Sequence, residues 1–126
     1  MTKRSKSSSA RILSVSQHKN VLDTKNAVLR SAGYEVVTTM DLSEAERIAA
    51  NDNVPWTAAV LGDSIPYALR RDLGRNLKRK IPGLAVVELL RSSDPAPDLK
   101  ACDAWLNALD GPEILLETLH SLRKPK

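Results

Sequence analysis

The chain is predicted to be a single α/β domain in which helices cover both faces of a parallel β-sheet. Three observations lead to this prediction. Short apolar or β-branched runs, beginning with Arg11–Val15, alternate with amphipathic helical patterns along the sequence. The predicted strands are nearly continuous in apolar residues, which is typical of strands that are buried on both faces. The length of 126 residues suits one domain with a substantial core.

The first half of the chain is predicted to alternate strand and helix twice. An amphipathic helix over 19–32 follows the first strand, and Gly33 is placed to end this helix as a C-cap. The β-branched run 34–38 is predicted as the second strand. Ser43 and Glu46 have the spacing of a capping box, which predicts that the second helix begins there.

The middle of the chain is predicted to form the third strand over 57–61, a helix, and the fourth strand over 84–90. The helix between them carries apolar residues at a spacing of four, and we expect these side chains to form its buried stripe. They are Ile65, Leu69, Leu73 and Leu77. Pro82 and Gly83 follow as a signal that ends the helix.

The segment 91–103 does not fit a regular helix, because Pro95 and Pro97 both disfavour one. We expect one or two helical turns near its end, or an irregular crossover. The fifth strand is predicted over 104–106, and Asp110 is expected to cap the last helix. The residues expected on the inner face of that helix are Leu115, Leu119 and Leu122.

Composition divides the chain into a domain over 10–123 and two basic ends. The Ser-rich segment 1–9 is predicted to be disordered, and 124–126 forms a short basic C-terminal end. No apolar run approaches the roughly 20 residues that a membrane-spanning helix needs. The single cysteine, Cys102, cannot form an internal disulfide, which favours a cytoplasmic location; we expect it to be a small buried side chain.

The formal net charge of +4 hides an uneven distribution of charge. Six basic residues and one acidic residue lie in the segment 70–80, whereas the rest of the domain is acidic. Four basic residues lie opposite the predicted apolar stripe of this helix, namely Arg71, Arg75, Lys78 and Arg79. This face is either a solvated surface or a contact surface for an acidic protein or a nucleic acid. No aromatic residues lie among these cations, as single-strand stacking would require.

Three local patterns occur in the order and spacing of a known family. They are Arg-Ile-Leu-Ser-Val at 11–15, Ala-Gly-Tyr-Glu-Val-Val at 32–37, and Asp-Gly-Pro-Glu-Ile-Leu-Leu at 110–116. On these patterns the chain resembles a response-regulator receiver domain of the CheY-like type. The resemblance implies a flavodoxin-like (βα)5 sandwich with parallel strands in the order 2-1-3-4-5. It also implies that 91–103 stands where a fourth helix, here shortened or irregular, would lie.

The resemblance also shows which residues stand where receivers carry their phosphorylation chemistry. The matching positions are Ser16 and Gln17 for the Mg²⁺-binding acidic pair, Gly62 for the acceptor aspartate, Leu90 for the hydroxyl residue, and Ala108 for the lysine. Asp63 comes one position after the acceptor position, and we expect it to cap or begin the basic helix instead. Trp105 is the counterpart of the switch aromatic residue.

The function expected from these positions is that of a pseudo-receiver that cannot be phosphorylated and binds a protein partner in bacterial signalling or regulation. No metal, cofactor or enzymatic activity is expected, because phosphoryl transfer depends on neutralising charge with metal and lysine. The candidate partner-binding residues are the four cations of the basic helix and Trp105. The alternative is a regulatory protein that associates with nucleic acid through the basic helix and tails. Glu88, inside an apolar strand, is expected to pair with an arginine or to reach water at the end of the sheet.

Overall fold

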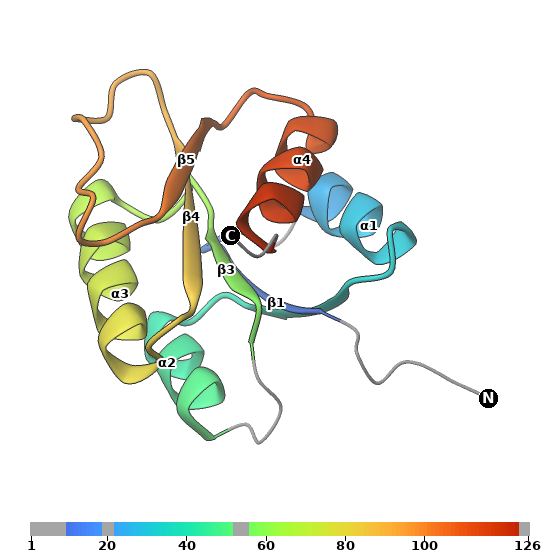
Figure 1. Ribbon diagram of the computed structural model, residues 1–126. Coiled ribbons are helices and arrows are strands. Elements are labelled where there is room, and N and C mark those ends of the chain that lie inside the picture. The colour runs from blue at the N-terminus through green and yellow to red at the C-terminus, as the bar shows by residue number, and fades with distance from the viewer. Residues whose placement is uncertain (1–9, 19–21, 52–55, 124–126) are drawn as a thin grey trace.

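One five-stranded parallel sheet organises the protein, whose computed structural model describes residues 10–18, 22–51 and 56–123 (Figure 1). The strands are β1 (Arg11–Val15), β2 (Glu35–Thr39), β3 (Ala58–Leu61), β4 (Ala85–Leu90) and β5 (Ala104–Asn107). They lie in the order β2-β1-β3-β4-β5, which confirms the flavodoxin-like order expected from the resemblance. The predicted tails, 1–9 and 124–126, and the predicted start of the first helix, 19–21, lie outside the described residues.

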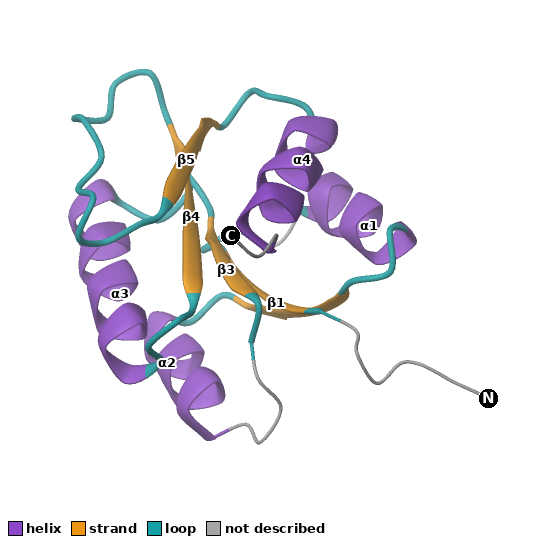
Figure 2. Ribbon diagram, viewed as in Figure 1, coloured by secondary structure: helices purple, strands orange, loops and turns teal. Residues whose placement is uncertain are grey.

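Four helices cover the sheet, two on each face (Figure 2). They are α1 (Asp23–Ser31), α2 (Leu42–Asn51), α3 (Tyr67–Lys80) and α4 (Pro112–Arg123). Leu29 of α1 and Leu115 of α4 pack in one core, and Ala45 of α2 and Leu77 of α3 pack in the other. Each fully buried leucine contributes roughly 1.5–3 kcal/mol to folding. Within the described residues, no helix is long and apolar enough to cross a membrane.

The connection between β4 and β5 contains no helix. Its residues, 91–103, run through turns and lie against α3, so the irregular crossover is confirmed and the fold has four helices rather than five. The contact is close at Gly74, where a Cβ atom would lie only 2.3 Å from the carbonyl oxygen of Ala101. A residue without a side chain is therefore what allows the crossover backbone to approach the helix.

The predicted buried stripe of α3 is wrong at Leu69, whose side chain is 46% exposed, while Arg70 is only 1% exposed. The physical reason is that a spacing of four residues drifts by about 40° per step around a helix with 3.6 residues per turn. Ile65, which lies before the helix begins, and the middle residues Leu73 and Leu77 are buried as expected.

Local signals at helix ends were predicted with mixed success. Gly33 has φ of +100°, as expected for a residue that ends α1. The predicted capping box of α2 is wrong, because Asp41 accepts hydrogen bonds from the backbone N–H groups of Ser43 and Glu44. Glu46 accepts a hydrogen bond from Asn76 on α3 instead.

The start and end of α4 also differ from the sequence expectation. Asp110 turns back toward β5, where its Oδ2 accepts a hydrogen bond from the backbone N–H of Asn107 at 3.1 Å. This contact replaces the predicted cap of α4. Leu122 is 37% exposed, whereas Leu115 and Leu119 are buried as expected.

Candidate functional site

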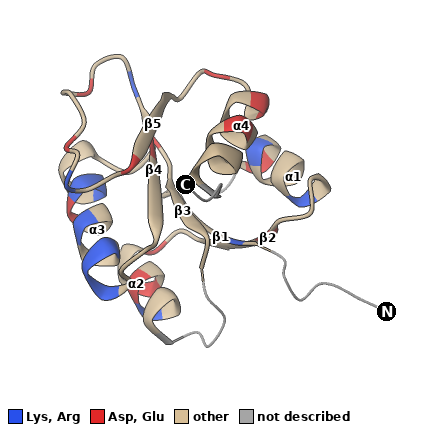
Figure 3. Ribbon diagram, viewed as in Figure 1, with Lys and Arg blue, Asp and Glu red and all other residues tan. Residues whose placement is uncertain are grey.

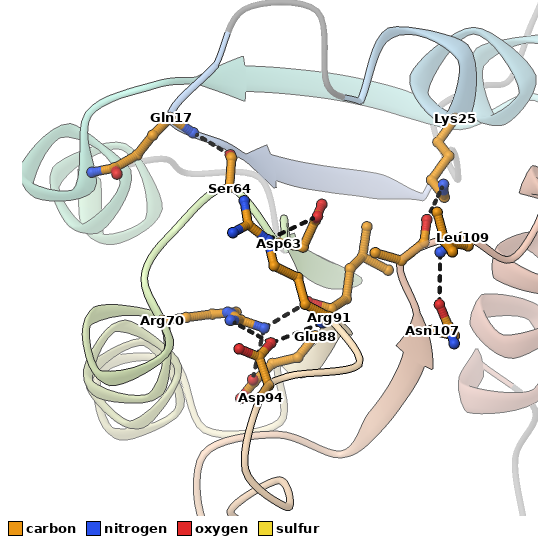
Figure 4. A network of polar contacts seen from close by, with 12 residues as sticks. Gln17, Lys25, Asp63, Ser64, Arg70, Glu88, Arg91, Asp94, Asn107 and Leu109 are labelled. Atoms are coloured by element: carbon orange, nitrogen blue, oxygen red, sulfur yellow. Dashed lines mark hydrogen bonds and ion pairs between the residues drawn. The ribbon is translucent and has the colours of Figure 1, made fainter.

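The carboxyl ends of the parallel strands meet at one edge of the sheet, which is where ligands bind in open α/β folds. Ser16 and Gln17 follow β1 at this edge. The Ser16 hydroxyl donates to the carbonyl oxygen of His18 at 3.0 Å, and the Gln17 backbone N–H donates to the Ser64 hydroxyl at 2.9 Å (Figure 4). These two positions therefore supply neutral oxygen atoms rather than a pair of carboxylates.

Gly62 directly follows β3, and a side chain at this position would be tightly packed. A Cβ atom there would lie 3.2 Å from both the Val15 carbonyl oxygen and the Ser16 Cβ, and 3.4 Å from Leu22 Cδ1. The Gly62 N–H also donates to the same Val15 carbonyl at 2.8 Å. The first carbon of an acceptor side chain would thus be in tight contact with Val15, Ser16 and Leu22.

Asp63 is held by a cation from the next strand connection. Its Oδ2 lies 3.4 Å from Nε of Arg91, which directly follows β4 (Figure 4). Asp63 was expected to cap or begin the basic helix, but α3 begins at Tyr67 with no side-chain cap at Pro66. The expectation is wrong because the loop of 62–66 carries the carboxylate away from the helix and toward Arg91.

A lysine is present at this edge, although it comes from a different element than the resemblance predicts. Nζ of Lys25, on α1, donates to the carbonyl oxygen of Ala108 at 3.3 Å. Ala108 and Leu90 line a hollow of about 280 Å³ together with Asp63 and Arg91. Neither Lys25 nor Arg91 was singled out in the sequence, because both are ordinary surface cations by local pattern and are brought here only by the fold.

The basic face of α3 is largely neutralised by acidic residues, several of them on the crossover. Arg75 pairs with Asp98, and Nζ of Lys78 lies 2.7 Å from Oδ2 of Asp103. Figure 3 shows red segments on the connection between β4 and β5, close to the blue segments of α3. The other two candidate cations have more local partners, since Arg71 contacts Asp72 and Arg79 donates to Asn76.

Arg70 forms the buried counterpart of these surface pairs. Its guanidinium donates to the Leu89 carbonyl oxygen at 2.6 Å and to Oδ2 of Asp94 at 2.9 Å, and its Nη1 lies 3.9 Å from Oε1 of Glu88 (Figure 4). Glu88 is 0% exposed, so its predicted arginine partner is found and its alternative contact with water is not. Arg70 thereby joins α3, β4 and the crossover.

Burial and hydrogen bonds shift the pKa values of the groups around Arg70. Burial raises the pKa of Glu88 above its ordinary value, and the nearby Arg70 charge only partly offsets this effect. Asp94 is also partly desolvated, but hydrogen bonds from the Arg91 backbone and from Arg70 hold its pKa below its ordinary value. Burial and the neighbouring Glu88 raise the pKa of Cys102 to about 12, so this cysteine is an unreactive thiol.

Trp105 lies on β5 and is 47% exposed. It lines a second hollow, of about 290 Å³, with Leu90, Arg91, Ser92 and Asn107. Within residues 10–18, 22–51 and 56–123, no group of three or more His, Cys, Asp or Glu side chains is arranged to hold a metal ion.

Solved structures that resemble this one share a single fold. A CheY-like receiver domain from Methanospirillum hungatei superposes with a TM-score of 0.79 at 21% identity, covering 90% of this chain and 93% of that one. The chemotaxis protein CheY4 of Vibrio cholerae gives a TM-score of 0.75 at 21% identity, covering 91% and 99%. The fold is that of receiver domains.

A third similar structure is the receiver domain of the sensor histidine kinase PA1611 from Pseudomonas aeruginosa, with a magnesium ion coordinated in its active-site cleft. It has a TM-score of 0.76 at 20% identity and covers 91% of this chain and 98% of that one. No protein-family model matches the sequence, and no curated protein matches it either. At this level of identity the similarity establishes the receiver fold, while the chemistry must be argued from the residues themselves.

Proposed function

We propose that this chain is a receiver-fold module that acts without phosphorylation, by binding a protein partner in bacterial signalling or regulation. The observation that carries the proposal is the glycine at the acceptor position, where even a Cβ atom would be crowded by Val15, Ser16 and Leu22. The proposal assigns no catalytic activity and no cofactor to the chain.

The donor set at the edge of the sheet supports the same proposal. Divalent ions such as Mg²⁺ prefer carboxylate oxygens, and the receiver of PA1611 holds magnesium in its cleft. In this chain Ser16 and Gln17 offer a hydroxyl and an amide, while the nearby carboxylate of Asp63 already pairs with Arg91. A phosphoryl group at this edge would therefore lack the metal that normally neutralises it.

Phosphorylation should fail even when a carboxylate is restored at the acceptor position. We expect neither the wild-type protein nor Gly62→Asp to gain mass on incubation with acetyl phosphate and Mg²⁺, as measured by intact mass spectrometry. Gly62→Asp should also lower the free energy of unfolding, by about 1–3 kcal/mol, because its Cβ atom would be crowded by Val15, Ser16 and Leu22. Gly62→Ala is the matched control that separates crowding from charge. A stoichiometric, hydroxylamine-labile adduct on Asp63 or on the introduced carboxylate would overturn the proposal.

The rival proposal, a nucleic-acid-associated protein, is weakened by the pairing of α3. Arg75 and Lys78 are engaged by Asp98 and Asp103, and Lys80 lies 3.6 Å from Glu46. Cations that already have acidic neighbours release fewer counterions from phosphates, which is the main source of affinity in nonspecific binding. The net charge of +5 that is counted along the segment 70–80 thus overstates the positive potential of the folded surface.

Nucleic-acid binding should accordingly be feeble at about 0.15 M salt, where exposed charges are screened beyond about 8 Å. Fluorescence anisotropy with labelled duplex DNA and single-stranded RNA measures this for a truncated form that begins at Ala10. The double variant Arg71→Glu, Arg79→Glu changes the basic face without touching the pairs that hold the crossover. Tight binding that this variant abolishes, with a steep dependence on salt concentration, would favour the rival proposal instead.

A further inference from the structure

The absence of a helix between β4 and β5 leaves part of one sheet face uncovered. Trp105 and Asn107 are two residues apart on β5, so their side chains lie on the same face, and both are exposed. Leu90 is paired with Asn107 in the parallel register and lines the same hollow as Trp105 and Asn107. The two hollows of about 280 and 290 Å³ share the lining residues Leu90, Arg91, Ser92 and Asn107, so they are neighbours and are together called the β4–β5 hollow here.

Four kinds of chemistry converge on the β4–β5 hollow. Trp105 supplies a flat aromatic surface, and Leu90 supplies an apolar floor. The Arg91 side chain is 56% exposed, and a guanidinium presents a planar fork of donors that matches phosphate oxygens. Asn107 also lines the hollow, and its Oδ1 accepts from the Leu109 backbone N–H at 2.8 Å.

We propose that the β4–β5 hollow binds a nucleotide, with the base stacked on Trp105 and the phosphate held by Arg91. Base stacking on an aromatic side chain and bidentate phosphate binding by arginine are both strong, geometrically defined interactions. The hydroxyl groups of Ser92 and Ser93, which line the same hollow, add donors for the phosphate. The Asn107 amide can donate to an acceptor on the base edge. Binding at this site is non-covalent, so it goes beyond the proposed function by giving the module an input that needs no phosphoryl transfer.

Asp63 gives the proposed site an internal competitor. Its carboxylate lies 3.4 Å from Arg91 Nε, and a phosphate group must displace it or share the guanidinium. Removing this negative charge while keeping the side-chain shape should therefore strengthen phosphate binding. This expected increase in affinity distinguishes a specific phosphate site at Arg91 from general electrostatic attraction, because most substitutions at a binding site lower the affinity.

The positions of the two tryptophans make the binding directly measurable. Trp56 is 7% exposed and packs in the core, whereas Trp105 is exposed in the hollow, so quenching of tryptophan fluorescence by a bound base reports on Trp105. We expect GMP or AMP, titrated into the wild-type protein, to quench part of the fluorescence, with saturation that calorimetry reproduces. Guanosine and inorganic phosphate, each titrated alone, should bind at least about tenfold more weakly, because each lacks one of the two interactions.

Substitutions then test each part of the site by calorimetry. Arg91→Ala and Trp105→Ala should each weaken GMP or AMP binding about tenfold or more. Asp63→Asn should strengthen it. Arg79→Ala is the matched control, because this arginine is exposed on α3 and bonds only to Asn76 among the described residues; its variant should bind like the wild type.

Four results would overturn the proposal. The first is that GMP, AMP and their cyclic mono- and dinucleotide forms show no saturable binding, and the second is that inorganic phosphate binds as tightly as the nucleotide. The third is that Arg91→Ala binds the nucleotide as tightly as the wild type. The fourth is that Asp63→Asn binds it more weakly than the wild type. Binding of an acidic peptide in place of any nucleotide would likewise assign the hollow to a protein partner. None of these outcomes depends on the phosphorylation assay, so this inference and the proposed function can fail separately.

Discussion

Arg70→Met should lower the free energy of unfolding by about 3–5 kcal/mol, the loss expected when one member of a buried charge cluster is removed. The arginine is 1% exposed and is the cation nearest to Glu88, which is 0% exposed. Without Arg70, the Leu89 carbonyl oxygen and Asp94 each lose one donor, although Asp94 keeps the hydrogen bond from the Arg91 backbone N–H. Urea unfolding of the wild type and the variant measures the difference.

The neighbouring residue supplies the control for this prediction. Arg71 contacts Asp72 at the surface, and Arg71→Met should change the free energy of unfolding by less than about 0.5 kcal/mol. Adding Glu88→Gln to Arg70→Met should recover part of the loss, because it removes the buried negative charge. A loss below about 1 kcal/mol for Arg70→Met would mean that water reaches Glu88 and that the cluster is not dry.

The dependence of stability on pH gives a second measurement on the same cluster. Burial raises the pKa of Glu88 from its ordinary 4.5, so the folded protein holds this proton to higher pH than the unfolded chain does. The wild type should therefore lose stability relative to Glu88→Gln as the pH rises from 4.5 through the raised value. The contribution of Asp94 to stability changes with pH in the opposite direction, since its pKa is lowered from 3.8. Its stabilising contribution is present above 3.8, and the advantage of the wild type over Asp94→Asn should disappear as the pH falls through the lowered value.

Much of the architecture could be predicted from the sequence because it depends on local signals. The strand Arg11–Val15 was predicted with its observed bounds, and Pro95 and Pro97 correctly indicated an irregular crossover. Buried parallel strands read as apolar runs whatever their neighbours are, and proline restricts the backbone wherever it occurs. The strand order came from the resemblance rather than from periodicity, and the structure agrees with it.

The charge arrangement could not be predicted, because it depends on contacts between distant segments. Counting charges along the chain made 70–80 strongly basic, yet Asp94, Asp98 and Asp103 fold back onto this helix. Nothing in the local pattern around Arg70 shows that Glu88 and Asp94 will surround it. The same is true at the edge of the sheet, where Arg91 meets Asp63 across 28 residues of sequence.

Gly74→Val should release the crossover from α3 and lower the free energy of unfolding by about 1–3 kcal/mol or more. A Cβ atom at this position would lie 2.3 Å from the Ala101 carbonyl oxygen and 3.2 Å from its carbonyl carbon. Because the contact is with backbone, no side-chain rotation can relieve it, and the crossover itself must move. Urea unfolding measures the loss. Hydrogen exchange should show faster exchange at Ala101 and Cys102, whose N–H groups donate to Asp98 at 2.8 and 3.2 Å.

Gly74→Ala makes the argument sharper, because helix propensity and packing predict opposite signs. In an exposed helix interior, alanine is more stable than glycine by about 1 kcal/mol. The difference in the free energy of unfolding between Asp72→Ala and Asp72→Gly measures this effect of helix propensity at an exposed position of α3, two residues from Gly74. Gly74→Ala should be less stable than the wild type despite that gain, since even one methyl group enters the Ala101 contact. If Gly74→Ala instead stabilises the protein as much as the Asp72 pair predicts, the crossover does not lie against α3 in solution. In that case the open face of β5 around Trp105 would need another explanation.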